Sequence, residues 1–260
     1  MHILELSLDR PAGSPFRSAL ASPELQEILA ALRSALRPTA RVFVVGGFLR
    51  RAARIELERA VEPLGDLDLI VDDPEPLALP PGSLPGPITT NVFKGYRWFA
   101  PGVFRHVDVW RLADHYSIRL FNRPPTIQMA MVGFPFNVER AAVDVTARVA
   151  YDGGCVDGIR TRRIRFDPVD LYLEHLQAVR AVLLQRKTGF AFDHSVLALL
   201  AARPWDGMKG EIRHYLELDG WVASSIDTLF DELDVLGRSA GVMARADDGR
   251  SRKVPGASRR

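Results

Sequence analysis

Short apolar runs with two different periods predict a chain that mixes strands and helices. Residues 41–45 and 67–71 are apolar or alternate in polarity, as strands do. Residues 48–57 and most of the chain after residue 168 repeat their apolar positions every three or four residues, as helices do. The pattern therefore predicts an α+β fold, with strands concentrated in the first two thirds and helices in the last third.

The order of these elements divides the chain into four segments. Residues 1–38 are predicted to be an N-terminal arm and a helix. Residues 39–166 are predicted to form a small mixed β-sheet with flanking helices, and residues 167–236 an all-helical segment. Residues 237–260 mix Gly, Ser and Ala with charged residues, so we expect a disordered basic tail.

The bulk composition is that of a soluble globular protein. Of the 260 residues, 47% are hydrophobic and 25% are charged, and the net charge is only +2, which argues against a molecule that binds polyanions over its whole surface. The single cysteine, Cys155, excludes an internal disulfide and favours a reducing compartment. Without an apolar leader or a membrane-length apolar run, we expect a cytoplasmic protein that is not bound to a membrane.

Two aspartates at the start of a predicted strand are the strongest candidates for chemistry. Asp66 and Asp68 are two residues apart, so their carboxylates lie on one face and repel each other unless a cation joins them. Asp108 lies in a second alternating stretch and supplies a third carboxylate. A D-x-D pair alone also occurs in surface turns, but three carboxylates on neighbouring strands could hold two Mg²⁺ ions.

A diglycine precedes these aspartates, between a predicted strand and a predicted helix. Gly46 and Gly47 would let the backbone approach a phosphate at the positive end of the helix. A Gly-Gly pair alone is more often a turn, but here the next strand delivers Asp66 and Asp68. The combination predicts a site for phosphoryl or nucleotidyl transfer.

At these residues the chain resembles the polymerase-β nucleotidyltransferase superfamily. More narrowly, it resembles the head and neck of bacterial poly(A) polymerases and class II CCA-adding enzymes. The resemblance covers about residues 40–195 and extends to the segments Phe134-Pro135-Phe136-Asn137, Tyr151 to Ile159, Arg163 to Phe166, and Glu174 to Asp193.

The resemblance implies roles for particular residues. Asp66, Asp68 and Asp108 would hold two Mg²⁺ ions and carry the catalysis. The nucleoside triphosphate would be bound by a further set: Gly46, Gly47, Arg50, Asn137, Glu174 and Arg180. The implied activity is transfer of a nucleoside monophosphate to an acceptor hydroxyl, with release of pyrophosphate.

Several positions depart from the family pattern, and they concern the sugar and the base. Val132 and Gly133 stand where the family has an Arg-Asp pair. Glu174 and Gln177 stand for the Asp and the Arg that select the base. Because an amide lacks the charge and the donor fork of a guanidinium, base selection is expected to be altered.

The acceptor is the least determined part of this reading. The resemblance favours an RNA 3′ end, of the kind found in tRNA. The chain stops soon after the helical segment, however, so a small molecule or a protein side chain stays open as the acceptor. A nucleotide-binding regulator without catalysis is a further alternative, against which the three retained carboxylates count.

Other polar residues near the predicted site have weaker claims. His106 would share a strand face with Asp108, but a half-buried sheet histidine is the plainer interpretation. Lys94, Tyr96 and Arg97 flank a glycine and could meet a triphosphate or an acceptor, although an exposed strand face explains them equally well.

Overall fold

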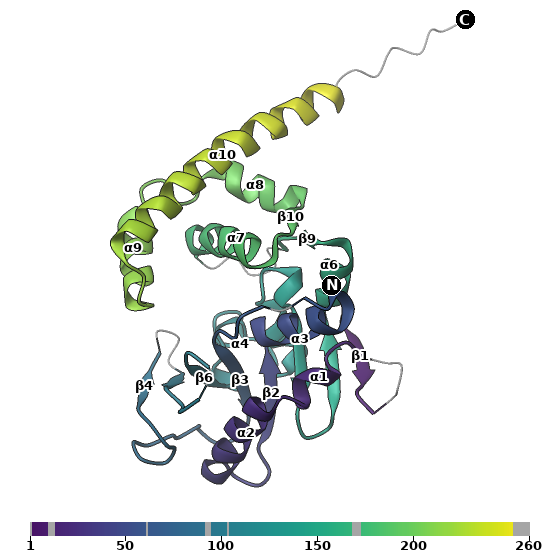
Figure 1. The fold of residues 1–260 in the computed structure, drawn as a ribbon, viewed down its shortest axis with the longest axis vertical. Coiled ribbons are helices and arrows are strands. Elements are labelled where there is room, and N and C mark those ends of the chain that lie inside the picture. Colours follow the sequence, from purple (N-terminus) through teal and green to yellow (C-terminus); the bar gives the residue numbers. More distant parts are fainter. Residues whose placement is uncertain are drawn as a thin grey trace, which may run out of the picture. The chain divides into compact units, whose positions relative to one another are not determined.

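The computed structural model divides the chain into two compact units, Met1–Arg162 and Arg163–Arg260 (Figure 1). The structure describes residues 2–9, 14–60, 62–91, 95–102, 104–167 and 173–251, with side chains described up to residue 242. Lys94, which the sequence singled out, lies outside the described residues.

The first unit is built on an eight-stranded mixed sheet with the strand order β1-β8-β7-β2-β3-β6-β5-β4. Among the described strands, β3 and β6 pair in parallel and the other neighbours pair antiparallel. This architecture confirms the predicted α+β class. The strands are β1 (Leu4–Ser7), β2 (Arg41–Val45), β3 (Leu67–Asp72), β4 (Ile88–Thr90), β5 (Tyr96–Trp98), β6 (Val107–Arg111), β7 (Ala141–Asp144) and β8 (Val149–Asp152).

Short helices connect and cover these strands. In α2 the Ser22 hydroxyl accepts a hydrogen bond from the Leu25 amide, and Pro23 occupies the first turn, so the helix begins where its residues favour a start. The helices are α1 (Arg17–Leu20), α2 (Pro23–Ala35), α3 (Gly47–Glu58), α4 (Tyr116–Arg119), α5 (Ile127–Val132) and α6 (Cys155–Thr161), with 3₁₀ turns η1 (Leu112–Asp114) and η2 (Asn137–Glu139).

The N-terminal segment is part of the sheet, whereas the sequence pattern assigned residues 1–38 to a separate arm. β1 pairs antiparallel with β8, and the Leu8 amide donates to the Arg148 carbonyl at 3.0 Å. The pairing partner lies more than a hundred residues away, so no local pattern could reveal it. Strand β1 therefore belongs to the unit that carries the candidate site and is not a separate arm.

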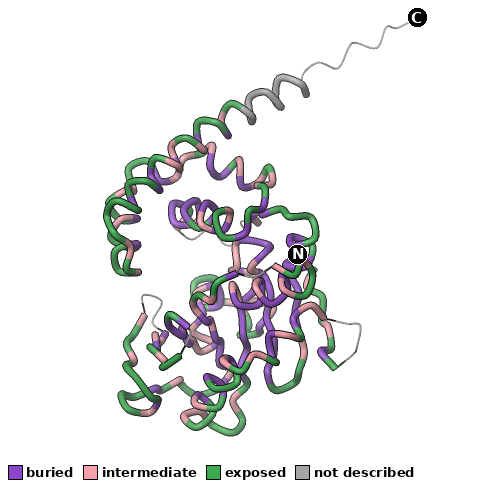
Figure 2. Tube along the Cα trace, viewed as in Figure 1, coloured by how far each residue is buried: buried purple, intermediate pink, exposed green. Residues whose placement is uncertain are grey.

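The sheet is buried along its central strands (Figure 2). On one face, Phe43, Val45 and Ile70 form a core with α5 and the turn after β6. On the same sheet, α3 packs against β2, β3 and β7. Cys155 is fully buried, its thiol donates to the Val138 carbonyl, and burial raises its pKa well above the ordinary value. These layers fix the ends of β2, β3 and β6, where the candidate residues lie.

The described residues of the second unit, 163–167 and 173–251, form helices and one small parallel ladder. β9 (Arg163–Ile164) pairs with β10 (Ala191–Phe192), and the helices are α7 (Glu174–Thr188), α8 (His194–Ala202), α9 (Lys209–Leu218) and α10 (Ala223–Ser251). No helix in the described part of the chain is both long enough and apolar enough to cross a membrane.

Helix α10 continues to Ser251, although the sequence pattern predicts disorder from residue 237. Gly237 does not end the helix because it is a contact position: a Cβ atom there would lie 2.9 Å from the Trp205 ring. Ala240, one turn later, is also buried. Residues 252–260 of the predicted tail lie outside the described residues.

Candidate active site

The carboxylates of Asp68 and Asp108 face the same side of the sheet from neighbouring strands. β3 and β6 run parallel with Asp68 in register with Asp108, so alternation places Asp66 and His106 on that side as well. Val45 pairs with Asp68 on the opposite neighbour, β2. The alternating pattern thus delivers these side chains to one edge of the central strands, beside the turn that follows β2.

His106 lies between two of the acids. Its Nδ1 is 3.3 Å from Asp66 Oδ1, and its Nε2 is 3.4 Å from Asp108 Oδ2. The ring is buried, so its place is set by the sheet rather than by solvent. His106 therefore joins Asp66 to Asp108 as part of the cluster, which is more than the packing role that the sequence favoured.

Asp108 is held by an arginine on the next strand. Arg97 Nε donates to Asp108 Oδ1 at 3.0 Å, and Arg97 Nη2 donates to Oδ2 at 2.9 Å, a two-pronged pair. Burial raises the pKa of Asp108, but hydrogen bonds from His106 and Arg97 lower it more, and the resulting pKa lies below its ordinary value. Asp108 is therefore a buried carboxylate whose charge is already balanced.

Asp66 and Asp68 are more accessible than Asp108. Both are partly exposed, with 37% of the Asp66 side chain accessible, whereas only 9% of the Asp108 side chain is. Their oxygens are the hard donors that Mg²⁺ prefers. Among the described residues, no three His, Cys, Asp or Glu side chains are grouped to hold a metal ion. The donor set of Asp66 and Asp68 fits such a cation, whereas Asp108 would first have to exchange Arg97 for it.

The diglycine turn lies directly against Asp68. Gly46 has φ +72°, which favours glycine, and a Cβ atom there would lie 2.9 Å from Asp68 Oδ2. Gly46 is also the N-cap of α3, and its carbonyl accepts from the Leu49 amide. The absence of side chains at this turn leaves the backbone of the helix N-terminus next to the carboxylate, and the phosphate site at this turn stays a prediction.

Arg50, predicted to hold a triphosphate, already has partners in the structure. Only 4% of it is exposed, its Nη1 donates to Glu139 Oε1 at 2.9 Å, and its Nη2 donates to Glu62 Oε2 at 3.3 Å. Glu62 also pairs with Arg54. Two carboxylates already pair with its guanidinium, so Arg50 would have to exchange at least one of them to bind a triphosphate.

Asn137 is buried inside the first unit. It begins η2, is buried, and packs so closely on α6 that a Cβ atom at Gly158 would lie 2.4 Å from its Nδ2. The 3₁₀ turn directs this side chain into the protein. Its contact with the nucleotide stays a prediction.

Glu174 and Arg180 belong to α7 of the second unit, so the geometry of the first unit does not bear on them. Glu174 is the first residue of α7 and lies in its acidic first turn. Arg180 is exposed on the same helix. Both stay predictions as nucleotide contacts.

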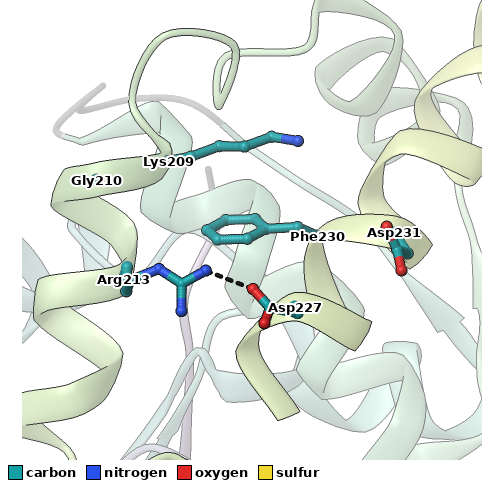
Figure 3. A pocket seen from close by; sticks show the side chains of 6 residues that line it. All are labelled: Lys209, Gly210, Arg213, Asp227, Phe230 and Asp231. Atoms are coloured by element: carbon teal, nitrogen blue, oxygen red, sulfur yellow. Dashed lines mark hydrogen bonds and ion pairs between the residues drawn. The ribbon is translucent and has the colours of Figure 1, made fainter. Parts of the chain in front are cut away.

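A hollow of about 420 Å³ opens between α9 and α10 of the second unit. Figure 3 shows Lys209 and Arg213 on α9 beside the ring of Phe230 on α10. Both cations are engaged: Lys209 Nζ is 2.9 Å from Asp234 Oδ2, and Arg213 pairs with Asp227. The hollow therefore offers no uncompensated positive charge for a phosphate.

Sequence reasoning missed the partners of the acids. The sequence marks Arg97 and His106 only as separate candidates, and it does not single out Phe99, which lies beside His106. The signal was present in the register, because Arg97 alternates with Phe99 as Asp108 does with His106. It becomes readable only once β5 is known to pair with β6.

Comparisons with known proteins connect this fold to the CCA-adding enzymes. No family model matches the chain, and no curated protein does. Among solved structures, a CCA-adding enzyme in complex with CTP matches at 17% identity and a TM-score of 0.54, over 85% of this chain and 55% of that one. The Thermotoga maritima CCA-adding enzyme complexed with tRNA matches at 17% identity and a TM-score of 0.52, over 75% of this chain and 46% of that one. A CCA-adding enzyme in complex with ATP matches at 15% identity and a TM-score of 0.51, over 90% of this chain and 50% of that one.

These matches establish a shared fold. The chain spans about half the length of the enzymes it matches. Because fewer than a fifth of the aligned residues are identical, the likeness carries the arrangement of elements and leaves the activity to the site itself.

Proposed function

We propose that the protein transfers a nucleoside monophosphate from a nucleoside triphosphate to an acceptor hydroxyl and releases pyrophosphate. One observation carries this proposal: Asp68 lies against the glycine turn that begins α3, with Asp66 beside it on the same face. A backbone that can approach phosphate and two accessible carboxylates that can hold a cation stand next to each other. Together these groups can support nucleotidyl transfer.

The residues of the site have separable tasks in this scheme. The Gly46–Gly47 turn and the N-terminus of α3 receive the triphosphate through backbone amides. Asp66 and Asp68 would hold Mg²⁺, which supplies Lewis-acid chemistry that lowers the pKa of a hydroxyl and neutralises phosphate charge. The acceptor oxygen bonds to the α-phosphorus, the bond to the bridging oxygen of pyrophosphate breaks, and the hydroxyl proton passes to a carboxylate or to water.

Asp108 and His106 act as positioning residues in this proposal. The Arg97 pair keeps Asp108 ionised, and His106 ties Asp108 to Asp66. If Asp108 binds the cation during turnover, its guanidinium partner must move. Glu174 and Arg180 of α7 remain our candidates for contacts with the base.

An RNA 3′ end is the acceptor that we favour. The solved enzymes of this fold include complexes with tRNA, CTP and ATP, which support an RNA acceptor and a nucleoside triphosphate donor. A small molecule or a protein side chain is the alternative acceptor.

A second candidate function is nucleotide binding without transfer. The observation that favours it is the bidentate Arg97–Asp108 pair, which occupies both oxygens of the third carboxylate. Such a protein would bind a nucleoside triphosphate but would not cleave it.

Pyrophosphate release tests the proposed function directly. The protein is incubated with Mg²⁺, each α-labelled nucleoside triphosphate in turn, and total cellular RNA or protein. We expect Mg²⁺-dependent release of pyrophosphate together with label in the RNA fraction. Nucleotide binding without any release, under all these conditions, would establish the second candidate instead.

A further inference from the structure

An exposed phenylalanine continues the functional face of the sheet beyond the carboxylates. β5 pairs antiparallel with β6 so that Arg97 faces Asp108 and Trp98 faces Val107. The next step of this register places Phe99 beside His106, and their ring centroids are 6.2 Å apart in an edge-to-face arrangement. Phe99 therefore touches the residue that links Asp66 to Asp108.

The side chain of Phe99 is open to solvent although its backbone is fixed. Phe99 is 43% exposed, whereas the preceding Trp98 is 1% exposed and faces the core. The Phe99 amide donates to the Pro87 carbonyl at 2.9 Å, which anchors the residue on the β4 side of the sheet. An exposed aromatic ring on an anchored backbone, beside the buried His106 and Asp108, has the properties of a stacking platform.

The order of the strands decides which substrate meets this ring. The diglycine turn follows β2, on one side of β3, while Phe99 follows β5, on the far side of β6. In-line transfer requires the leaving pyrophosphate and the attacking hydroxyl to lie on opposite sides of the α-phosphorus. With the triphosphate at the glycine turn, the attacking group approaches from the side of β5.

We propose that Phe99 stacks on the terminal base of a single-stranded RNA acceptor and so presents its 3′ hydroxyl to the carboxylates. The inference rests on the proposed function for the direction of approach. Stacking on a phenyl ring accepts any base, so this contact supplies affinity and position rather than sequence selection.

The test uses a short single-stranded oligoribonucleotide with 2-aminopurine at its 3′ end, added to the full chain with Mg²⁺ and no nucleoside triphosphate. Stacking on Phe99 quenches the fluorescence of the terminal base, and a probe with 2-aminopurine at the 5′ end should not be quenched. Phe99→Ala and Phe99→Leu should lose the quench and bind about five- to a hundredfold more weakly. Phe99→Tyr should keep both.

Phe121→Ala is the matched control. Phe121 is 41% exposed on the same unit but follows α4, away from the β5 register, so this variant should bind as the unaltered protein does. Equal quenching and affinity in Phe99→Leu and the unaltered protein would overturn the proposal, as would an unaltered protein that does not bind the probe.

Pyrophosphate release separates this inference from the proposed function. If Phe99→Ala releases pyrophosphate with an unchanged KM for RNA, the stacking role is wrong and the proposed transferase activity stands. If the quenching depends on Phe99 but the protein releases no pyrophosphate, base stacking on Phe99 is supported and the proposed transferase activity is wrong.

Discussion

The three aspartates of the candidate site differ in which groups lie beside their carboxylates. Asp108 has Arg97 and His106, whereas Asp66 and Asp68 are partly exposed beside a glycine turn. We expect Asp66→Ala and Asp68→Ala each to lower the rate of pyrophosphate release by about a thousandfold or more, because each removes a carboxylate that we propose as a ligand of the cation. Thermal unfolding should be unchanged or slightly higher, since repulsion is relieved.

Asp72→Asn is the control for these variants. Asp72 lies at the other end of β3 on the same face and contacts Arg41 at 3.8 Å. Loss of the Asp72 charge should leave the rate of pyrophosphate release unchanged. It should alter the free energy of unfolding by less than about 1 kcal/mol, as for other exposed ion pairs. Near-normal activity in both Asp66→Ala and Asp68→Ala would contradict the assignment.

A buried histidine predicts how the stability depends on pH. Burial lowers the pKa of His115 to about 4, and its ring packs against Tyr116 and Phe134. Between pH 6.5 and 4 the unfolded chain binds a proton at His115 that the folded chain does not, so stability falls as the pH falls through this window.

The size of this effect follows from the shift. A pKa near 4 against an unfolded value of about 6.5 corresponds to about 3 kcal/mol of stability lost by pH 4. Urea unfolding at pH 7 and pH 5 should show a smaller loss in His115→Gln than in the unaltered protein, by about 2 kcal/mol. An equal loss in both proteins would assign the acid sensitivity to other groups.

At the scale of elements, the turn between β2 and α3 links fold and site. Gly46→Ala introduces backbone strain and a methyl group 2.9 Å from Asp68 Oδ2. Gly82→Ala also places a side chain at a positive φ, +83°, but with no atom within 4 Å. Each should destabilise the protein by about 1–3 kcal/mol in urea unfolding.

Only Gly46→Ala should also move the Asp68 carboxylate, so only this variant should lose pyrophosphate release, by about tenfold or more. If Gly82→Ala lost as much activity as Gly46→Ala, the effect would be one of stability rather than of the position of Asp68.

Elements that rest on neighbouring residues could be predicted from the sequence, and partners distant along the chain could not. The β2–turn–α3–β3 unit and the shared face of Asp66 and Asp68 follow from short apolar patterns. The burial of Arg50 depends on Glu139, 89 residues away, and the Arg97–Asp108 pair depends on the register of β5. Both required the pairing of elements, which no single stretch encodes.

At the scale of the whole molecule, the two units carry different parts of the expected specificity. The sequence resemblance implies that Gln177, on α7, stands where the family has a base-reading arginine, and the side chain of Val132 has no polar group. We expect no ordered C-C-A addition, and instead a preference for one nucleotide or weak selection. Sequencing the products from a tRNA that lacks its 3′ end, CTP and ATP measures this, and efficient C-C-A completion would refute it.

The buried thiol of Cys155 makes it possible to measure how often the first unit opens. Because it is the single cysteine of the chain and lies in α6, a thiol reagent can label only a molecule in which this part has opened. The raised thiol pKa slows the native reaction further. Tryptophan fluorescence mixes both units, through Trp98 and Trp205 among others, whereas the labelling rate follows the first unit alone. Nucleoside triphosphate bound at the glycine turn should slow that labelling in proportion to its occupancy.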